Sequence, residues 1–414
     1  MASVRKIRKI IFLKEVLFIA ITAYGGPQAH IAIFIDFFVK KRGYLTEEEL
    51  IELNALCQIL PGPTSTQTIT AIGYKIGGAN LAYLTLLLWV LPAAIIMTSI
   101  ALGITYLRDQ NISTEFTRFI QPMAIGIIAY ASYVISSKVI KTSLSKILMI
   151  FSVISALLIS TFLGQSLIGT LFYPLVIIIS GLITALLYKK DNKPTLQEKK
   201  TLNIQYDNLF LFFGVFILSV IIGNSMSNRS VLLFENFYRN GSLIFGGGQV
   251  LIPLLNAEFV DYKHYLTSAE FRSGIGFVQA VPGPVFSISS YIGCLSMRGA
   301  GTTGQIIGSM VSTLGIFLPG TFLIFFVIRF WERLKEYPII KASIEGVNAA
   351  SSGLIAAVAI ILFLSLGVNY KSTLGLVDVT IVIASFFTLL LTKVRAPYLI
   401  ISGLVMGLIW QFIL

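Results

Sequence analysis

Charged side chains are scarce in this chain, and so are the residues that usually bind metals or form disulfides. Aspartate, glutamate, lysine and arginine make up 12% of the 414 residues, about half of the share in soluble domains, whereas 56% are hydrophobic. The only cysteines, Cys57 and Cys294, both lie in apolar sequence, which argues against a disulfide framework and against a metal site. The composition excludes a typical soluble domain and indicates an integral membrane protein.

Acidic residues are few compared with basic ones, 19 against 31, which leaves a net charge of +12. The basic residues lie mostly in short loops, where lysine and arginine mark the cytoplasmic side of a membrane and attract anionic lipid. We therefore expect a lipid bilayer to be the partner of these charges, and we expect no binding of nucleic acid.

Long apolar stretches recur along the chain. Crossing about 30 Å of hydrocarbon takes roughly 18 or more apolar residues. We predict an all-α membrane protein with about nine full transmembrane helices, and the nine windows are 79–107, 115–137, 147–162 with its flanks, 166–188, 207–223, 303–328, 345–366, 374–391 and 397–414.

The tripeptide Pro-Gly-Pro occurs twice, and its surroundings repeat with it at a constant offset of 221 residues. Between positions 24 and 63, 14 of the 40 aligned pairs are identical, which indicates an internal duplication. The repeat continues through the apolar N-terminal stretch, so we expect this stretch to be retained and not cleaved as a signal peptide. The matched segments are Gly25-Gly26-Pro27-Gln28 with Gly246-Gly247-Gly248-Gln249, Tyr44-Leu45-Thr46 with Tyr265-Leu266-Thr267, Gln58 with Gln279, and Pro61-Gly62-Pro63 with Pro282-Gly283-Pro284.

The duplication divides the chain into two repeats of opposite orientation. We predict a first repeat at 1–188, a lysine-rich cytoplasmic linker at 189–206, a connecting transmembrane helix at 207–223 and a second repeat at 224–414. Basic loops alternate with uncharged ones in opposite order in the two repeats, and an extra crossing between them would invert the second repeat. Inverted-topology repeats with broken helices are typical of membrane transporters.

Both repeats contain apolar segments that are interrupted in the middle by glycine and proline. Two prolines around a glycine cannot be helical, and unwound backbone within a bilayer is tolerated only where protein or water surrounds it. We predict re-entrant helix hairpins at these breaks. Single kinked crossings are the alternative.

The breaks also predict where an anion would bind. A half-helix begins after each Pro-Gly-Pro, and its free backbone N–H groups and positive dipole end favour an anion. If the repeats are inverted, the two tips approach the midplane from opposite faces and share one asymmetric cavity. The expected site residues are Gly25, Gly26, Gln28, His30, Gln58, Pro61, Gly62, Pro63, Thr64, Ser65, Thr66, Gly246, Gly247, Gln249, Arg272, Gln279, Pro282, Gly283, Pro284 and Ser287.

Several of these residues have a structural reading beside the functional one. Glu49 and Glu270 resemble ion-coupling carboxylates, yet each stands three residues after a threonine, which predicts a capping box. His30 could titrate near neutral pH or pack in the core. Arg272 could face an anion, because a charge at membrane depth is expensive without a function. Both Gln58 and Gln279 could instead bond unwound backbone.

At its repeated motifs, the chain resembles the chromate transporter family in its long, two-domain form, over nearly its whole length. The resemblance implies a multi-pass protein of the bacterial inner (plasma) membrane that exports chromate, with sulfate as a structural mimic. The segments that carry it are Tyr24 to Ile31, Leu56 to Gln67, Phe245 to Gln249 and Phe277 to Pro284.

Together, these features predict a secondary transporter that exports chromate, or a related tetrahedral oxyanion, by alternating access. Export of a dianion from a negative-inside cell gains roughly 4.6 kcal/mol per 100 mV, so it needs no coupled ion. A sulfate or other small-anion carrier and a channel are alternatives. An enzyme acting on a phosphate-bearing lipid is disfavoured, because the apolar segments contain no paired carboxylates or nucleophile with a base. We expect no cofactor and no metal, and a homodimer is left open.

Overall fold

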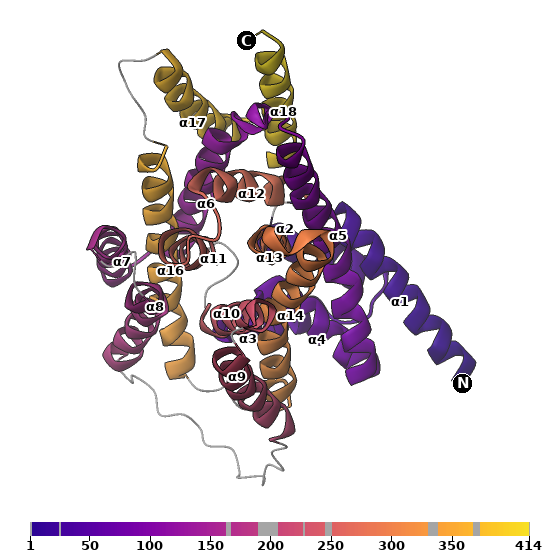
Figure 1. Cartoon of the computed structure of the whole chain (residues 1–414). Helices are drawn as coiled ribbons and strands as arrows, with labels where there is room; N and C mark the ends of the chain where they lie inside the picture. Colours follow the sequence, from indigo (N-terminus) through magenta and orange to yellow (C-terminus); the bar gives the residue numbers. More distant parts are fainter. Residues whose placement is uncertain are drawn as a thin grey trace.

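A computed structural model describes residues 2–24, 26–162, 167–188, 206–226, 228–244, 251–329, 338–366 and 373–413, and these residues form helices without any strand (Figure 1). The first repeat contains α1 (Ala2–Thr22), α2 (Gly26–Phe34), the π-helical segment η1 (Ile35–Lys41), α3 (Glu47–Ile59), α4 (Thr64–Gly77), α5 (Ala79–Asp109), η2 (Glu115–Thr117), α6 (Ile120–Val139), α7 (Ser143–Phe162) and α8 (Leu167–Leu187).

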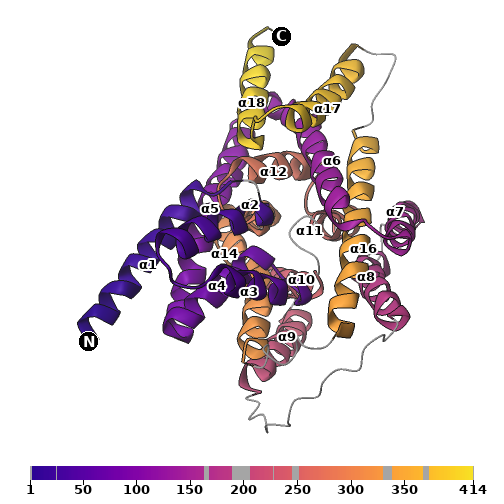
Figure 2. The ribbon, with the colours of Figure 1, turned by 180° about the vertical axis from the view of Figure 1, so that it is seen from behind.

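The second half follows the same order after a connecting helix, and Figure 2 shows the two halves from behind. It contains α9 (Asp207–Met226), α10 (Arg229–Leu243), α11 (Leu251–Leu255), the π-helical segment η4 (Asn256–Tyr262), α12 (Ser268–Ala280), η5 (Val285–Ser287), α13 (Ile288–Ser296), η6 (Arg298–Ala300), α14 (Gly301–Val327), α16 (Pro338–Leu364), α17 (Thr373–Leu391) and α18 (Ala396–Ile413).

Six of the nine predicted crossings are helices long and apolar enough to span a membrane within the described residues. They are Ala79–Asp109, Glu115–Val139, Ser143–Phe162, Arg298–Val327, Ala342–Leu364 and Leu374–Leu391. The other three windows coincide with shorter apolar helices at Phe172–Leu187, Asp207–Gly223 and Ala396–Gln411. Most of the predicted crossings are thus present at full length, and the remainder are apolar helices at the predicted places.

The duplication extends to the boundaries of the helices. The segments η1, α3 and the end of α1 all recur 221 residues later as η4, α12 and the end of α10. Side-chain contacts recur as well. The guanidinium of Arg8 lies 5.2 Å from the ring centre of Tyr44, and that of Arg229 lies 4.3 Å from the ring centre of Tyr265. The two repeats therefore share one tertiary structure in this region.

The broken segments form hairpins. With 13 and 14 residues, α3 and α4 are each too short to cross a bilayer, and they pack against each other. An ion pair of 2.5 Å joins Glu49 at the start of α3 to Lys75 at the end of α4. The same arrangement recurs at α12 and α13, where Glu270 and Arg298 are 2.5 Å apart. Because both ends of each unit meet, the prediction of hairpins is confirmed at the two Pro-Gly-Pro breaks, and a kinked single crossing is excluded there. Hairpins at the two glycine-rich breaks stay a prediction, because these breaks lie wholly or partly outside the described residues.

Each hairpin turns at the glycine of its Pro-Gly-Pro. The backbone φ angle is +119° at Gly62 and +105° at Gly283, a region that residues other than glycine rarely adopt. The flanking prolines supply no N–H to continue a helix. The sequence therefore fixes a sharp reversal at the same point of both repeats.

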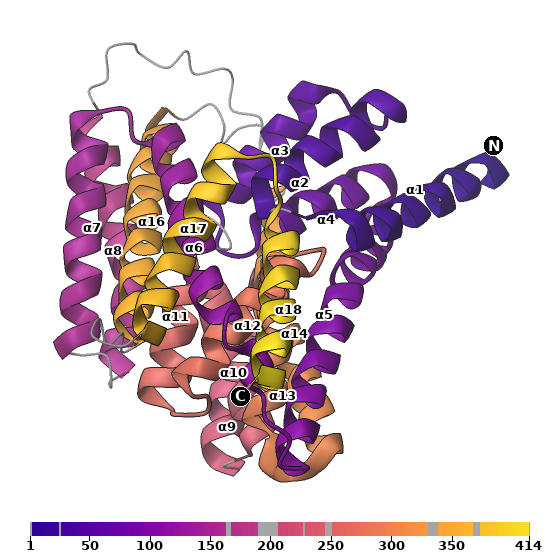
Figure 3. The ribbon, with the colours of Figure 1, turned by 90° about the horizontal axis from the view of Figure 1, so that it is seen from above.

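In Figure 3 the N-terminus lies at the upper right and the C-terminus lies lower, near the centre of the view, while α7, α8 and α16 stand side by side and roughly upright at the left. From the loop charges we predict that the N-terminus and the linker 189–206 are cytoplasmic and that the C-terminus is outside. The linker itself lies outside the described residues. Single cysteines can be placed in each of these three segments of a protein that lacks Cys57 and Cys294. Those in the N-terminus and the linker should react with an impermeant reagent from the cytoplasmic side, and the one in the C-terminus should react from the outside. Labelling of the linker and the C-terminus from one side would overturn the inverted arrangement.

Candidate functional site

The two Pro-Gly-Pro tips hold the repeats together through a reciprocal pair of backbone hydrogen bonds. The N–H of Gly62 donates to the carbonyl of Ile244 over 2.7 Å, and the N–H of Gly283 donates to the carbonyl of Ala23 over 2.9 Å. Both donors and both acceptors are related by the offset of 221 residues. The Pro-Gly-Pro tip of each repeat therefore bonds the residue that ends the first helix of the opposite repeat, just before its glycine-rich break, which places both tips at the interface between the repeats.

Each tip is also packed against the long helix of the opposite repeat. A Cβ atom added at Gly62 would come within 3.1 Å of the Cα of Gly320 in α14, and one added at Gly283 would come within 3.1 Å of the Cβ of Ala93 in α5. These contact points lie next to the prolines inside the two helices, Pro319 and Pro92. Only glycine, which has no Cβ atom, allows each tip to approach the opposite helix so closely.

Gln67 fixes the unwound backbone of the first tip. Its side-chain Nε2 donates to the carbonyl of Pro61 over 2.8 Å and to the carbonyl of Gly320 over 3.1 Å. This residue was not among the predicted site residues. Its position in the first turn of the half-helix was visible in the sequence, but its partner 253 residues away was not.

The hydroxyl groups at the start of α4 are buried and oriented by aromatic neighbours. The Nδ1 atom of His30 lies 3.1 Å from the Oγ of Ser65, and the indole N–H of Trp89 donates to the Oγ1 of Thr66 over 3.1 Å. The His30 ring also stands edge-on to Trp89, with 5.0 Å between the ring centres. His30 is fully buried and contacts Ser65 of the half-helix, so it packs against this half-helix and supports it.

In the second repeat, the corresponding hydroxyls are free. Ser287 and Ser289 are buried, and neither hydroxyl has a hydrogen-bond partner among the described residues. All four residues at 64–67 are polar, whereas Ser287 is the only polar residue at 285–288. The two starts also differ in bonding: Ser65 shares a hydrogen bond with His30 and Thr66 accepts one from Trp89, which leaves the Thr66 O–H free to donate, whereas Ser287 has no described partner.

The two repeated glutamines have unused amides. In the last turns of α3 and α12, Gln58 and Gln279 are half-buried, each three residues before its Pro-Gly-Pro. The Nε2 atom of Gln279 is buried and has no hydrogen-bond partner in the described part of the chain. Gln58 likewise makes no hydrogen bond to a described residue. Both amides can therefore donate to a ligand.

The glycine-rich breaks themselves are only partly described. Gly26 begins α2, and Gln28 lies in that helix, although nothing is described of its side chain. The predicted site residues Gly25, Gly246, Gly247 and Gln249 lie outside the described residues. Of the residues beside these breaks, Ala23 and Ile244 contact the opposite tips through their backbone carbonyls.

Both predicted capping boxes are present. The hydroxyls of Thr46 and Thr267 accept from the N–H groups of Glu49 and Glu270 over 3.2 Å, and the two carboxylates accept from the threonine N–H groups over 2.8 and 2.7 Å. The structural reading of these glutamates is thus confirmed. A carboxylate engaged in this way is poorly placed to bind a coupling ion.

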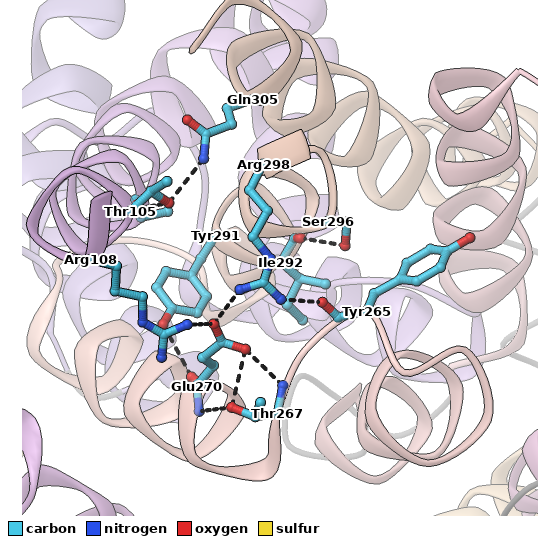
Figure 4. Close-up of polar contacts among 11 residues, drawn as sticks. Thr105, Arg108, Tyr265, Thr267, Glu270, Tyr291, Ile292, Ser296, Arg298 and Gln305 are labelled. Atoms are coloured by element: carbon cyan, nitrogen blue, oxygen red, sulfur yellow. Dashed lines mark hydrogen bonds and ion pairs between the residues drawn. The ribbon is translucent and has the colours of Figure 1, made fainter. Parts of the chain in front are cut away.

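Glu270 additionally ties the two repeats together (Figure 4). Its Oε1 atom contacts both Arg108 of α5 and Arg298, and the Arg298 contact measures 2.5 Å. The hydroxyl of Tyr291 donates to the backbone carbonyl of Glu270 over 3.1 Å, and Arg298 also donates to the carbonyl of Tyr265 over 2.9 Å. Sequence reasoning missed Arg108 and Arg298, because neither belongs to a repeated motif.

We expect Glu270→Gln to destabilise the protein at neutral pH much more than Glu49→Gln does. Burial alone would raise the pKa of Glu270, but the hydrogen bond from Arg298 and the cap outweigh it and hold this pKa below its usual range. Because the folded-state pKa is depressed, the stabilisation is present above the unfolded pKa of about 4.3 and is lost as pH falls through the folded value. Thermal unfolding in detergent between pH 7 and pH 3 measures this.

The matched variant Glu49→Gln likewise keeps a capping oxygen and removes only the charge, but the Glu49 carboxylate is far more exposed than the Glu270 carboxylate, so water screens its pair with Lys75. A difference between wild type and Glu270→Gln that does not shrink as pH falls would contradict the proposed electrostatic origin.

Arg272 does not reach the Pro-Gly-Pro tip. It is 6% exposed, and its guanidinium donates to the side chain of Gln121 over 3.1 Å and to the carbonyl and hydroxyl of Ser365 over 3.1 and 2.8 Å. These contacts join the second repeat's α12 to the first repeat's α6 and to the end of α16. As a site residue, Arg272 therefore belongs to a separate place in the molecule from the tips.

A fold of apolar spanning helices around two broken hairpins with free amides defines the class of a multi-pass membrane transporter. The family model described as chromate transporter matches residues 11–186 and 231–408. The chain therefore belongs to the chromate transporter family, and it is a multi-pass protein of the bacterial inner (plasma) membrane.

Individual relatives agree with this assignment. An uncharacterized transporter of Methanocaldococcus jannaschii is 24% identical and covers 94% of this chain and 91% of its own length. A chromate transport protein of Cupriavidus metallidurans is 24% identical, over 93% of this chain and 89% of its own. An uncharacterized transporter of Bacillus subtilis is 26% identical over only 43% of this chain but 95% of its own, so it is about one repeat long. No solved structure matches the chain.

Proposed function

We propose that this protein exports chromate, or a related tetrahedral oxyanion, by alternating access around the two Pro-Gly-Pro tips. The observation that carries the proposal is the reciprocal bonding of Gly62 and Gly283 to the breaks of the opposite repeat. A site held equally by two inverted repeats can open to either side when one repeat rocks against the other.

The donors at this site suit an anion. Two half-helix N-termini, the amides of Gln58 and Gln279 and the unpaired hydroxyl of Ser287 supply hydrogen-bond donors without a fixed counter-charge. Fixed dipoles can replace the water around an oxyanion, and because they carry no full counter-charge they still allow the oxyanion to leave. The name of the Cupriavidus metallidurans relative assigns chromate to that protein, and this chain shares its length and family.

Export is the direction that the membrane potential favours. Each elementary charge moved across the membrane is worth about 2.3 kcal/mol per 100 mV, so a dianion leaves a negative-inside cell downhill. The two repeated glutamates serve as caps and are not free to bind a coupling proton. A carrier of sulfate or another small anion is the second candidate, and enzymatic activity is not part of the proposal.

Uptake into inside-out vesicles tests the function. Vesicles that contain the protein should accumulate radiolabelled chromate when the interior is made positive, and they should lose this uptake when the potential is collapsed. Competition by unlabelled sulfate, molybdate and phosphate ranks the natural cargo. Absence of uptake of every oxyanion would refute the proposal, and flux at rates above those of carriers would replace the carrier by a channel.

A further inference from the structure

A cavity of about 280 Å³ lies between the repeats, away from the Pro-Gly-Pro tips. The α5–α6 connection and the start of α6 line it from the first repeat, and α12, α13 and α17 line it from the second. It lies on the side of the molecule that holds the end of α18, because the guanidinium of Arg118 at its wall lies 5.9 Å from the ring centre of Trp410. Its charged lining residues are Arg108, Glu115, Arg118, Glu270, Arg272 and Asp378.

Two of these arginines lack a close carboxylate. Arg272 is almost fully buried, yet the hydrogen bonds of its guanidinium go to neutral groups on Gln121 and Ser365, and no described carboxylate forms an ion pair with it. Taking a cation out of water is expensive unless a counter-ion compensates it. The cavity beside Arg272 is the open position where such a counter-ion fits.

Arg118 shows the same deficiency at the opposite wall. Its Nη2 atom is 4.0 Å from the nearest carboxylate oxygen of Asp378, which is too far for a hydrogen bond. The Nε of Arg118 and the Oδ1 of Asp378 are both buried without a partner among the described residues. The Arg118–Asp378 pair is therefore loose and leaves a donor unused.

The remaining acids do not fill the gap. The carboxylate of Glu270 is already shared between Arg108, Arg298 and its own helix cap, and Glu115 is exposed to solvent. The cavity thus combines two under-neutralised guanidinium groups with room for several waters. Guanidinium groups bind planar and tetrahedral oxyanions through paired N–H donors.

We propose that this cavity is a second oxyanion site, held by Arg118 and Arg272, at which the transported anion rests on the C-terminal face before release. This site rests on the proposed transport function for its role, but its ability to bind an oxyanion can be measured separately. Asp378 competes with the anion for both arginines and keeps the affinity low enough for release.

The test uses full-length protein in lipid nanodiscs, with Cys57 and Cys294 replaced by alanine and Thr114→Cys at the cavity wall. Sulfate should slow the reaction of this cysteine with a cationic thiol reagent. The sulfate concentration that gives half protection should rise about ten-fold or more in Arg118→Gln, as expected for the loss of a charge-assisted hydrogen bond. Arg395→Gln, in an exposed loop, is the matched control and should leave protection unchanged.

The variant Asp378→Asn distinguishes an oxyanion site from a merely structural ion pair between Arg118 and Asp378. It also tests the proposal if Arg118→Gln fails to fold. Removal of the competing carboxylate should lower the half-protecting concentration several-fold, whereas a structural pair predicts no gain. Lack of sulfate protection in the parent protein, or equal protection in all variants, would overturn the second site. Chromate uptake by the same parent protein in vesicles is scored independently, so failed transport with intact protection would refute only the transport function.

Discussion

Replacement of either Gly62 or Gly283 by leucine is expected to abolish oxyanion transport while the protein still inserts in the membrane. The positive φ angles of +119° and +105° lie where side chains are strained, at roughly 1–3 kcal/mol per residue. A Cβ atom would also press on Gln67 and Gly320 at the first tip and on Ala93 at the second. The tip would have to withdraw from the opposite repeat, which removes the site that both repeats form.

The matched control is Gly103→Leu in α5, where nothing lies within 4 Å of an added Cβ atom. This variant should keep both expression and transport. Chromate uptake in vesicles, normalised to the amount of protein in the membrane, measures the effect, and size-exclusion profiles in detergent report folding. Normal uptake by both tip variants would remove the Pro-Gly-Pro segments from the transport site.

Exchange of Gln58 or Gln279 for glutamate should reduce transport far more than exchange for alanine. Alanine removes one donor, at a cost of about ten-fold in affinity for a hydrogen bond to a charged ligand. Glutamate has nearly the same shape but only accepts hydrogen bonds, and its charge repels a dianion in a site of low dielectric constant. We expect a loss of at least about 100-fold for glutamate, since repulsion at 4 Å is worth about 4 kcal/mol per pair of unit charges at an effective dielectric constant of 20.

Affinity and flux in reconstituted vesicles, at a pH at which the glutamate is ionised, decide between ligand binding and a structural role. Gln110→Glu at the exposed end of α5 controls for an added negative charge on the protein. Glutamate variants that bind and move the anion as well as wild type would eliminate direct coordination. The structure favours coordination, because the brace that holds the first unwound tip is Gln67 and not Gln58.

The two tips differ in their unused hydrogen-bond donors, so variants of Gln58 and Gln279 should differ in their effect on transport. Around the first tip, Ser65 shares a hydrogen bond with His30, and Thr66 accepts one from Trp89 but keeps its own O–H as a donor. Around the second, Ser287 and the amide of Gln279 have no described partner. Both tips keep unused donors, but the unpaired Nε2 atom of Gln279 is buried, where water screens a charge less, so glutamate at position 279 should be the more damaging of the two.

The sequence by itself determined the elements whose causes are local. Pro-Gly-Pro breaks a helix wherever it occurs, a threonine three residues before a glutamate caps the helix that follows, and apolar windows of sufficient length form membrane helices. The duplication could also be read from residue identities at one offset. These signals gave the helices, the hairpin turns, the two repeats and the family.

Tertiary structure alone decided which partners these elements have. The bond from Gly62 to Ile244, the contact of Arg108 with Glu270 and the bond from Arg272 to Gln121 all join residues far apart in the chain. No periodicity or composition encodes such pairs, because they depend on how two repeats pack after each has folded. The same packing brought His30 and Trp89 to the hydroxyls of the first tip, left Ser287 without a described partner and enclosed the arginine cavity between the repeats.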